Sequence, residues 1–127
     1  LVTRDLSNLA IDRVAYVIWC NDEGKVLDDG TVFRLGENDF RLCAQHHQLD
    51  WLSISRLGFN VNIEKETDDI AALAVQGPTS FSVLNKVGIE GLDKLKPFQI
   101  CQQSISGIEI MISRTGFTGD LGYELWT

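Results

Sequence analysis

The sequence predicts an α+β fold, with an antiparallel sheet of about five or six strands and two or more packed helices. Segments typical of strands follow one another in runs, with turn residues between them. Two helical patterns interrupt these runs, whereas a doubly wound parallel sheet would alternate strand and helix regularly. With 127 residues, the chain has the size of one domain and is long enough to bury a core.

Three strands are expected first. Residues 14–20 form a nearly continuous apolar run that is typical of a buried strand, and residues 21–24 supply turn chemistry. Residues 26–35 alternate imperfectly, and a second turn at 36–38 leads to a third strand at 39–43. Consecutive strands joined by turns predict an antiparallel meander.

A helix and two further strands are expected in the middle of the chain. Residues 48–57 carry apolar side chains at steps of three and two, and Gly58 is a suitable helix end. Residues 59–64 alternate between apolar and polar types, which predicts a half-exposed strand. Residues 70–75 are apolar enough for a buried strand, which Gln76-Gly77-Pro78 then ends.

The C-terminal part predicts a second helix and a last group of strands. Thr79 or Ser80 can cap the helix. Its apolar face is Phe81, Leu84 and Val87. Residues 98–112 suggest a hairpin that turns at Ser106-Gly107, and residues 123–126 resume a strand after a glycine-rich segment.

Composition excludes several classes of function. A net charge of −7 and a pI near 4.6 argue against binding to nucleic acid or to an anionic membrane. No apolar run has the length of a membrane span. Cys20, Cys43 and Cys101 are widely separated, so they predict neither a disulfide framework nor a zinc site and fit a reducing compartment such as the cytoplasm. The missing initiator Met and the stop directly after a strand suggest part of a longer chain.

Two acidic features are candidates for chemistry. Gly116, Gly119 and Gly122 would allow positive φ angles and a close approach to a ligand, so that the turn presents Glu124; a hairpin with an exposed Glu is the alternative. Asp28 and Asp29 point to opposite faces of a strand, so only one of them can face a given cavity, as an isolated acid; a solvated strand end is the alternative.

The sequence does not indicate a metal site, a phosphate-binding loop or covalent catalysis. His46 and His47 are adjacent and diverge, with no ligand spacing nearby, so no metal site is expected. The chain has neither a phosphate loop nor a nucleophile elbow, and Cys20 and Cys43 lie in apolar strand contexts that favour core packing.

Three segments in the family's order resemble the glycine-cleavage T-protein (aminomethyltransferase) superfamily. They are Gly24-Lys25-Val26-Leu27-Asp28-Asp29, Ala74-Val75-Gln76-Gly77-Pro78 and Arg114-Thr115-Gly116-Phe117-Thr118-Gly119-Asp120-Leu121-Gly122-Tyr123-Glu124. The resemblance covers nearly the whole chain and implies that residues 1–127 are part of a tetrahydrofolate-binding domain of the T-protein type. That family passes one-carbon units to or from tetrahydrofolate without a metal.

The resemblance also implies roles for single residues. Asp29 matches the catalytic acid beside the pterin nitrogen that receives the carbon, and Asp28 would be its outward-facing partner. Glu124 matches the carboxylate that accepts two adjacent N–H donors of the pterin. Tyr16, Phe117 and Gln45 fall on folate-contacting positions, with Phe117 replacing the more usual Tyr and Gln45 the usual Asn.

The implied function is a tetrahydrofolate-dependent aminomethyl or methyl transferase. Its carbon donor would be a small molecule or an aminomethyl group on a lipoyl carrier, the lipoylated H-protein for a true T-protein. The location would be the cytoplasm, or the mitochondrial matrix in a eukaryote. The alternatives are a demethylase of dimethylglycine, sarcosine, dimethylsulfoniopropionate or aromatic methyl ethers, a non-catalytic folate-binding or iron–sulfur assembly protein, and a plain interaction module.

Overall fold

The computed structural model describes all residues, 1–127, and contains seven strands and two helices. In chain order the elements are β1 Arg13–Cys20, β2 Val26–Arg34, β3 Phe40–Ala44, α1 Leu49–Ser55, β4 Ala72–Gln76, α2 Ser80–Lys86, β5 Ile100–Ile105, β6 Ile108–Ser113 and β7 Gly122–Trp126. None of its helices has the length and apolar character needed to cross a membrane.

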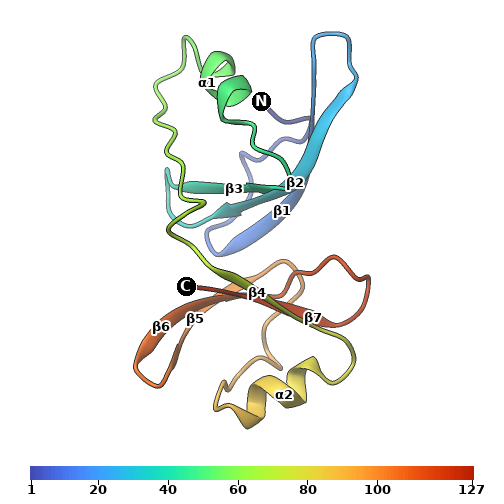
Figure 1. The fold of residues 1–127 in the computed structure, drawn as a ribbon, viewed down its shortest axis with the longest axis vertical. Coiled ribbons are helices and arrows are strands. Elements are labelled where there is room, and N and C mark those ends of the chain that lie inside the picture. The colour runs from blue at the N-terminus through green and yellow to red at the C-terminus, as the bar shows by residue number, and fades with distance from the viewer.

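The strands form two antiparallel sheets, which confirms the α+β class (Figure 1). The first sheet has the order β1-β2-β3 and the second the order β4-β7-β6-β5. The expected single sheet is divided because β4, after the long connection at 56–71, pairs with β7 and not with β3. A short bridge between Arg13 and Gln99 joins the two sheets along one side.

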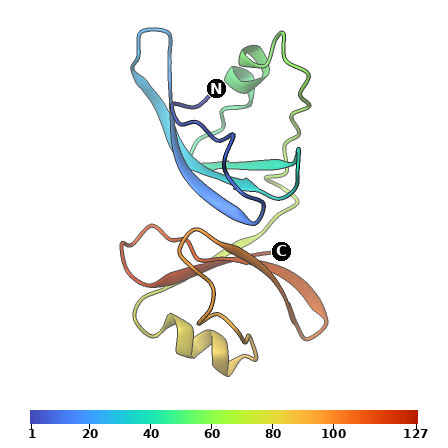
Figure 2. The same cartoon turned by 180° about the vertical axis from the view of Figure 1, so that it is seen from behind.

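Three apolar clusters give the molecule its layers. One cluster, built around Trp19 of β1, lies under the N-terminal segment and Trp51 of α1. A second, built around Phe33 of β2 and Met111 of β6, fills the space between the sheets. The third lies between the second sheet and α2, with Leu84 among its members. Figure 2, from behind, shows the N-terminal segment running along the first sheet and α2 on the far side of the second.

Two sequence predictions in the middle of the chain are wrong. Residues 59–64 form no strand: the amide of Phe59 donates to the carbonyl of Arg56, which is a turn contact, and no neighbouring strand pairs with this segment. The strand expected at 70–75 does exist as β4, yet it is mostly exposed, with Leu73 63% accessible. β4 is the edge strand of its sheet, so one of its sides has no partner.

The two helices and the last hairpin follow their predictions closely. α1 ends at Ser55, before the expected stop at Gly58. α2 begins after Thr79 as predicted, but the predicted cap is wrong: Thr79 makes no side-chain capping bond, and the Ser80 hydroxyl donates to the carbonyl of Leu121. Ser106 and Gly107 have φ angles of 53° and 84°, as a two-residue turn between twisted strands requires.

Candidate functional site

The face of the first sheet that looks toward the second sheet carries the candidate site. In the strand register Tyr16 of β1 lies opposite Thr31 of β2, and Thr31 lies opposite Cys43 of β3. Side chains of directly paired residues point to the same face, so these three form a row across the sheet. Phe33 follows Thr31 on that face and is fully buried between the sheets.

Tyr16 and Asp29 form a hydrogen-bonded pair on this face. The Tyr16 hydroxyl donates to Asp29 Oδ2 over 2.8 Å. This bond is the main reason why the pKa of Tyr16 lies above its usual value. The structure thus brings together two residues that the sequence singled out, a phenol and an exposed carboxylate with its second oxygen free.

Asp28 takes the opposite role from the one expected. It is the buried member of the pair, 7% exposed, and lies opposite Trp19 on the face covered by α1 and the N-terminal segment. Its carboxylate accepts the amide N–H of Asp29 at 2.9 Å and that of His46 at 3.3 Å. The Asp29 amide is the main cause that holds the pKa of Asp28 below its usual range. Asp28 therefore anchors the loop after β3, and Asp29 is the accessible acid.

Glu124 projects from β7 on the side that faces the first sheet. It is half-buried and lies opposite Ser113 in the β6–β7 register. Burial raises the pKa of the Cys43 thiol to about 11, and the negative charge of Glu124 adds to that increase. The carboxylate is thus on the second sheet, on the side of Cys43, the residue of β3 in the row that begins with Tyr16.

A network of hydroxyl groups holds the Glu124 carboxylate. The Thr115 hydroxyl donates a hydrogen bond to Glu124 Oε2. Ser113 Oγ lies 2.6 Å from Thr115 Oγ1, and the indole N–H of Trp126 donates to Ser113 Oγ over 3.0 Å. The sequence predictions assigned no role to these three residues, since nothing in their spacing indicates which side chain they contact.

Two glycines of the glycine-rich segment lie directly against the side chain of Gln76. Of its three glycines only Gly119 has a positive φ, 74°. A Cβ atom on Gly116 or Gly122 would lie 1.9 or 1.8 Å from Gln76 Oε1, because the Gln76 side chain lies against both. Gln76 Nε2 donates to the carbonyls of Thr115 and Tyr123. The expectation of positive φ at all three glycines is wrong at two of them, where the close approach is to Gln76.

The other two predicted folate contacts are exposed side chains. Gln45 is exposed and directly follows the last residue of β3. The next residue, His46, donates its amide N–H to the Asp28 carboxylate. Phe117 is 98% exposed at the tip of the glycine-rich segment. The structure therefore brings Tyr16 and Asp29 into contact, while Phe117 stands apart from them.

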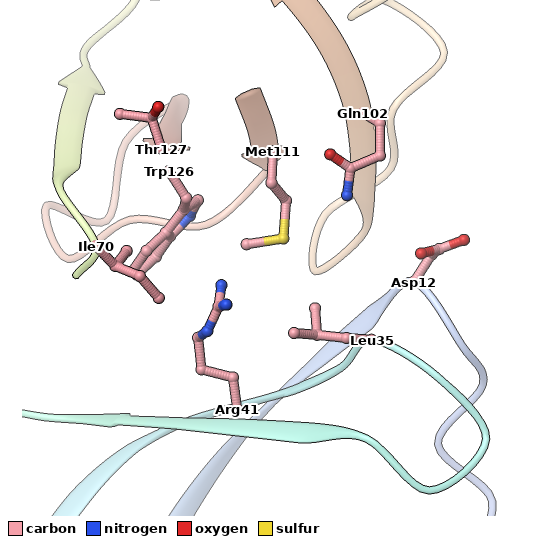
Figure 3. A pocket seen from close by; sticks show the side chains of 8 residues that line it. All are labelled: Asp12, Leu35, Arg41, Ile70, Gln102, Met111, Trp126 and Thr127. Carbon is pink, nitrogen blue, oxygen red and sulfur yellow. The ribbon is translucent and has the colours of Figure 1, made fainter. Parts of the chain in front are cut away.

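A cavity of about 260 Å³ opens between the sheets and is lined by Leu35, which follows β2, and by Thr127, which follows β7 (Figure 3). Arg41 of β3 points into it toward Trp126 and Met111. The Arg41 guanidinium also pairs with Glu66 over 2.9 Å. The cavity contains none of the predicted site residues, so it is not the candidate site.

A family model, curated relatives and a solved structure all match this chain over nearly its whole length. A family model described as "GCVT N-terminal domain" matches residues 1–127. Aminomethyltransferases of Halothermothrix orenii and Bacillus subtilis are 34% and 36% identical over 99% of this chain. The crystal structure of glycine cleavage system aminomethyltransferase T from Bartonella henselae matches 98% of the chain with a TM-score of 0.77 and 28% identity.

This chain spans only about a third of those relatives, 36% of the Halothermothrix and Bacillus enzymes and 34% of the Bartonella chain. The match to the family model nevertheless extends over every residue, and the fold agrees with that of a solved member. The chain belongs to the glycine-cleavage T-protein family.

Proposed function

We propose that this chain is part of a longer tetrahydrofolate-dependent one-carbon transferase, an aminomethyl or methyl transferase of the glycine-cleavage T-protein type. The observation that carries the proposal is the pairing of Tyr16 with Asp29 on one sheet, with Glu124 on the facing side of the other. The family resemblance assigns the role of the acid to Asp29 and that of the pterin acceptor to Glu124. The aminomethyltransferase relatives support the same class of reaction.

The residues present fit a reduced folate. The pterin edge offers two adjacent N–H donors, and an ionised carboxylate is the one side chain that only accepts hydrogen bonds. Glu124 is half-buried, and Thr115 occupies one side of a single oxygen, so acceptor capacity is left for a ligand. We propose Gln45 and Phe117 as further contacts, in line with their exposure.

Tetrahydrofolate, when bound, supplies the nitrogen that accepts the one-carbon unit. Asp29 would act on the proton of that group: Tyr16 holds Oδ2, and Oδ1 stays available to accept a proton or to face positive charge. Glu124 would fix the orientation of the ring system by its two oxygens. Recognition and proton transfer are thus assigned to different sheets.

The donor of the carbon defines the remaining candidates. In a true T-protein it would be an aminomethyl group on the lipoylated H-protein. A second candidate is a folate-dependent demethylase, favoured by Gln45, which is one methylene longer than the Asn usual for T-proteins. Cys20, Cys43 and Cys101 are free thiols, which supports a reducing compartment such as the cytoplasm.

Titration of the natural full-length protein with tetrahydrofolate tests both carboxylates. Glu124→Gln should weaken binding about 100-fold, because an amide replaces an acceptor by a donor and charge-assisted bonds contribute about 1.5–3 kcal/mol each. Asp29→Asn should abolish turnover and largely keep the affinity. Glu109→Gln, an exposed charge on β6, is the control.

Unchanged affinity in Glu124→Gln would remove the pterin role of that residue, and retained turnover in Asp29→Asn would remove Asp29 from catalysis. Residues 1–127 alone should be inactive and bind folate weakly or not at all, since family members close the folate channel between several domains. Micromolar binding by this piece in calorimetry would contradict that expectation.

A further inference from the structure

The hydrogen-bonded series that ends on Glu124 is almost entirely enclosed. Ser113 is fully buried and Thr115 is 8% exposed. Trp126 donates to Ser113, Ser113 and Thr115 share a bond, and Thr115 donates to Glu124. Each of these polar groups thus has a partner inside the protein, and the series reaches the surface at the Glu124 carboxylate, which is half-buried.

The chemistry of the four groups determines the direction of every bond. The Trp126 indole has only a donor, so Ser113 Oγ must accept from it. The Glu124 carboxylate has only acceptors, so the single proton of Thr115 points at Glu124. Thr115 Oγ1 must therefore accept a hydrogen bond from the Ser113 hydroxyl. This is the one bond that Ser113 Oγ donates. No hydroxyl in the series can turn without leaving a buried group unpaired, which is costly.

The strand register explains why these residues meet. Ser113 lies directly opposite Glu124 in the β6–β7 pair, and Trp126 is the next residue of β7 on the same face. The Trp126 ring packs edge-on against Phe33 of the first sheet, with ring centroids 5.0 Å apart. The series is thus anchored at the contact between the two sheets and ends at the candidate site.

We propose that Thr115, Ser113 and Trp126 are positioning residues that hold the Glu124 carboxylate in one rotamer, ready to accept two adjacent N–H donors of a reduced pterin. The inference rests on the function proposed above. A carboxylate fixed before binding loses less conformational freedom when the ligand arrives, so its affinity rises. A fixed pair of acceptors also selects against a ligand that lacks one of the two donors.

The test compares variants of the natural full-length protein by calorimetric titration with 5-formyltetrahydrofolate and with its 2-desamino analogue. Thr115→Val keeps the shape of the side chain and removes the hydroxyl; Thr115→Ser keeps the hydroxyl and is the matched control. We expect about a tenfold loss of affinity for Thr115→Val, the usual effect of a bond to a charged group, and less than about threefold for Thr115→Ser. Discrimination against the 2-desamino analogue should fall in Thr115→Val as well.

Two further measurements separate this role from a purely structural one. In a Glu124→Gln background, Thr115→Val should lower the affinity less than about twofold further, because the group it positions is gone. Trp126→Phe keeps a ring against Phe33 and removes the N–H. We expect it to weaken binding by about two- to fivefold, the contribution of a neutral hydrogen bond, with thermal unfolding confirming that the variant is folded.

The possible results of these titrations separate the positioning role from its alternatives. Wild-type affinity in a folded Thr115→Val protein, an equal loss in Thr115→Ser, or the same further loss in the Glu124→Gln background would each overturn the positioning role. If Thr115→Val does not fold, Trp126→Phe decides: unchanged affinity overturns the inference, and a loss that vanishes with Glu124→Gln supports it. Wild-type affinity in Glu124→Gln alone would remove the pterin role of Glu124 and overturn the inference with it, whereas no folate binding by the wild-type protein would refute the proposed function.

Discussion

Gly122→Ala should destabilise the protein through a single side chain, that of Gln76. A Cβ on Gly122 would lie 1.8 Å from Gln76 Oε1 and 2.3 Å from its Cδ, so the Gln76 side chain must move away. Gly122 does not have a positive φ, so an alanine brings no backbone strain there. The whole cost should come from the displaced amide.

The size of this cost follows from the contacts of Gln76. Its Nε2 donates to the carbonyls of Thr115, at 3.2 Å, and Tyr123, at 3.0 Å. Each bond contributes about 1 kcal/mol, and carbonyls left unpaired in a partly buried place cost more, so Gly122→Ala should lower the free energy of unfolding by about 2–4 kcal/mol. Folate affinity should fall too, because Thr115 also holds Glu124.

Urea unfolding of the full-length protein in a double-mutant cycle checks this reasoning. Gln76→Ala alone should cost about 2 kcal/mol, and Gly122→Ala added to it should cost nothing or stabilise slightly, since alanine restricts the unfolded chain. Gly36→Ala is the control, because its Cβ would lie 3.3 Å from Asp39 Cβ and meet no closer atom. A full cost of Gly122→Ala in the Gln76→Ala background, or a cost below about 1 kcal/mol in the wild type, would refute the explanation.

Three further changes test the strands around the acid. Tyr16→Phe removes the hydrogen bond to Asp29 and should lower turnover about three- to tenfold, measured by steady-state kinetics, with the change in folate affinity measured separately by titration. Gly30→Ala would place a Cβ 2.1 Å from the Cys43 carbonyl oxygen, so β2 and β3 must separate, at a cost of about 1–3 kcal/mol in urea unfolding. The pKa of Asp28 is lowered on folding, so its stabilisation is complete above the unfolded pKa of about 4 and is lost as the pH falls through the lower folded value. The difference in unfolding temperature between wild type and Asp28→Asn should therefore shrink as the pH falls below about 4, and a constant difference would contradict the assignment.

The local elements were predictable because their causes lie within a few residues. The turn at Ser106-Gly107 needs positive φ angles, and its residues are suited to them. The false strand at 59–64 shows the limit of such patterns, since alternation makes a strand possible while pairing depends on a neighbour from elsewhere in the chain. Likewise β4 has an apolar sequence, yet its place at the edge of a sheet leaves Leu73 exposed.

The candidate site shows the same division between local and distant causes. Alternation predicts that Asp28 and Asp29 face opposite ways, and the structure agrees. Which of them is buried depends on Trp19 opposite and on the loop at His46, and neither contact is encoded in the pair itself. The expectation of an outward Asp28 was wrong for this reason.

The split of the site between two sheets has a physical consequence for its chemistry. Asp29 lies on the first sheet and Glu124 on the second, so the distance between acid and acceptor depends on how the sheets pack. Phe33 and Trp126 form one of the contacts between the sheets, within the cluster around Phe33 and Met111, and Trp126 is also the first donor in the series that ends on Glu124. The aromatic pair therefore links the packing of the sheets to the hydrogen bonds that hold the carboxylate. A substitution at Phe33 should affect ligand orientation even though its side chain is fully buried and away from Asp29.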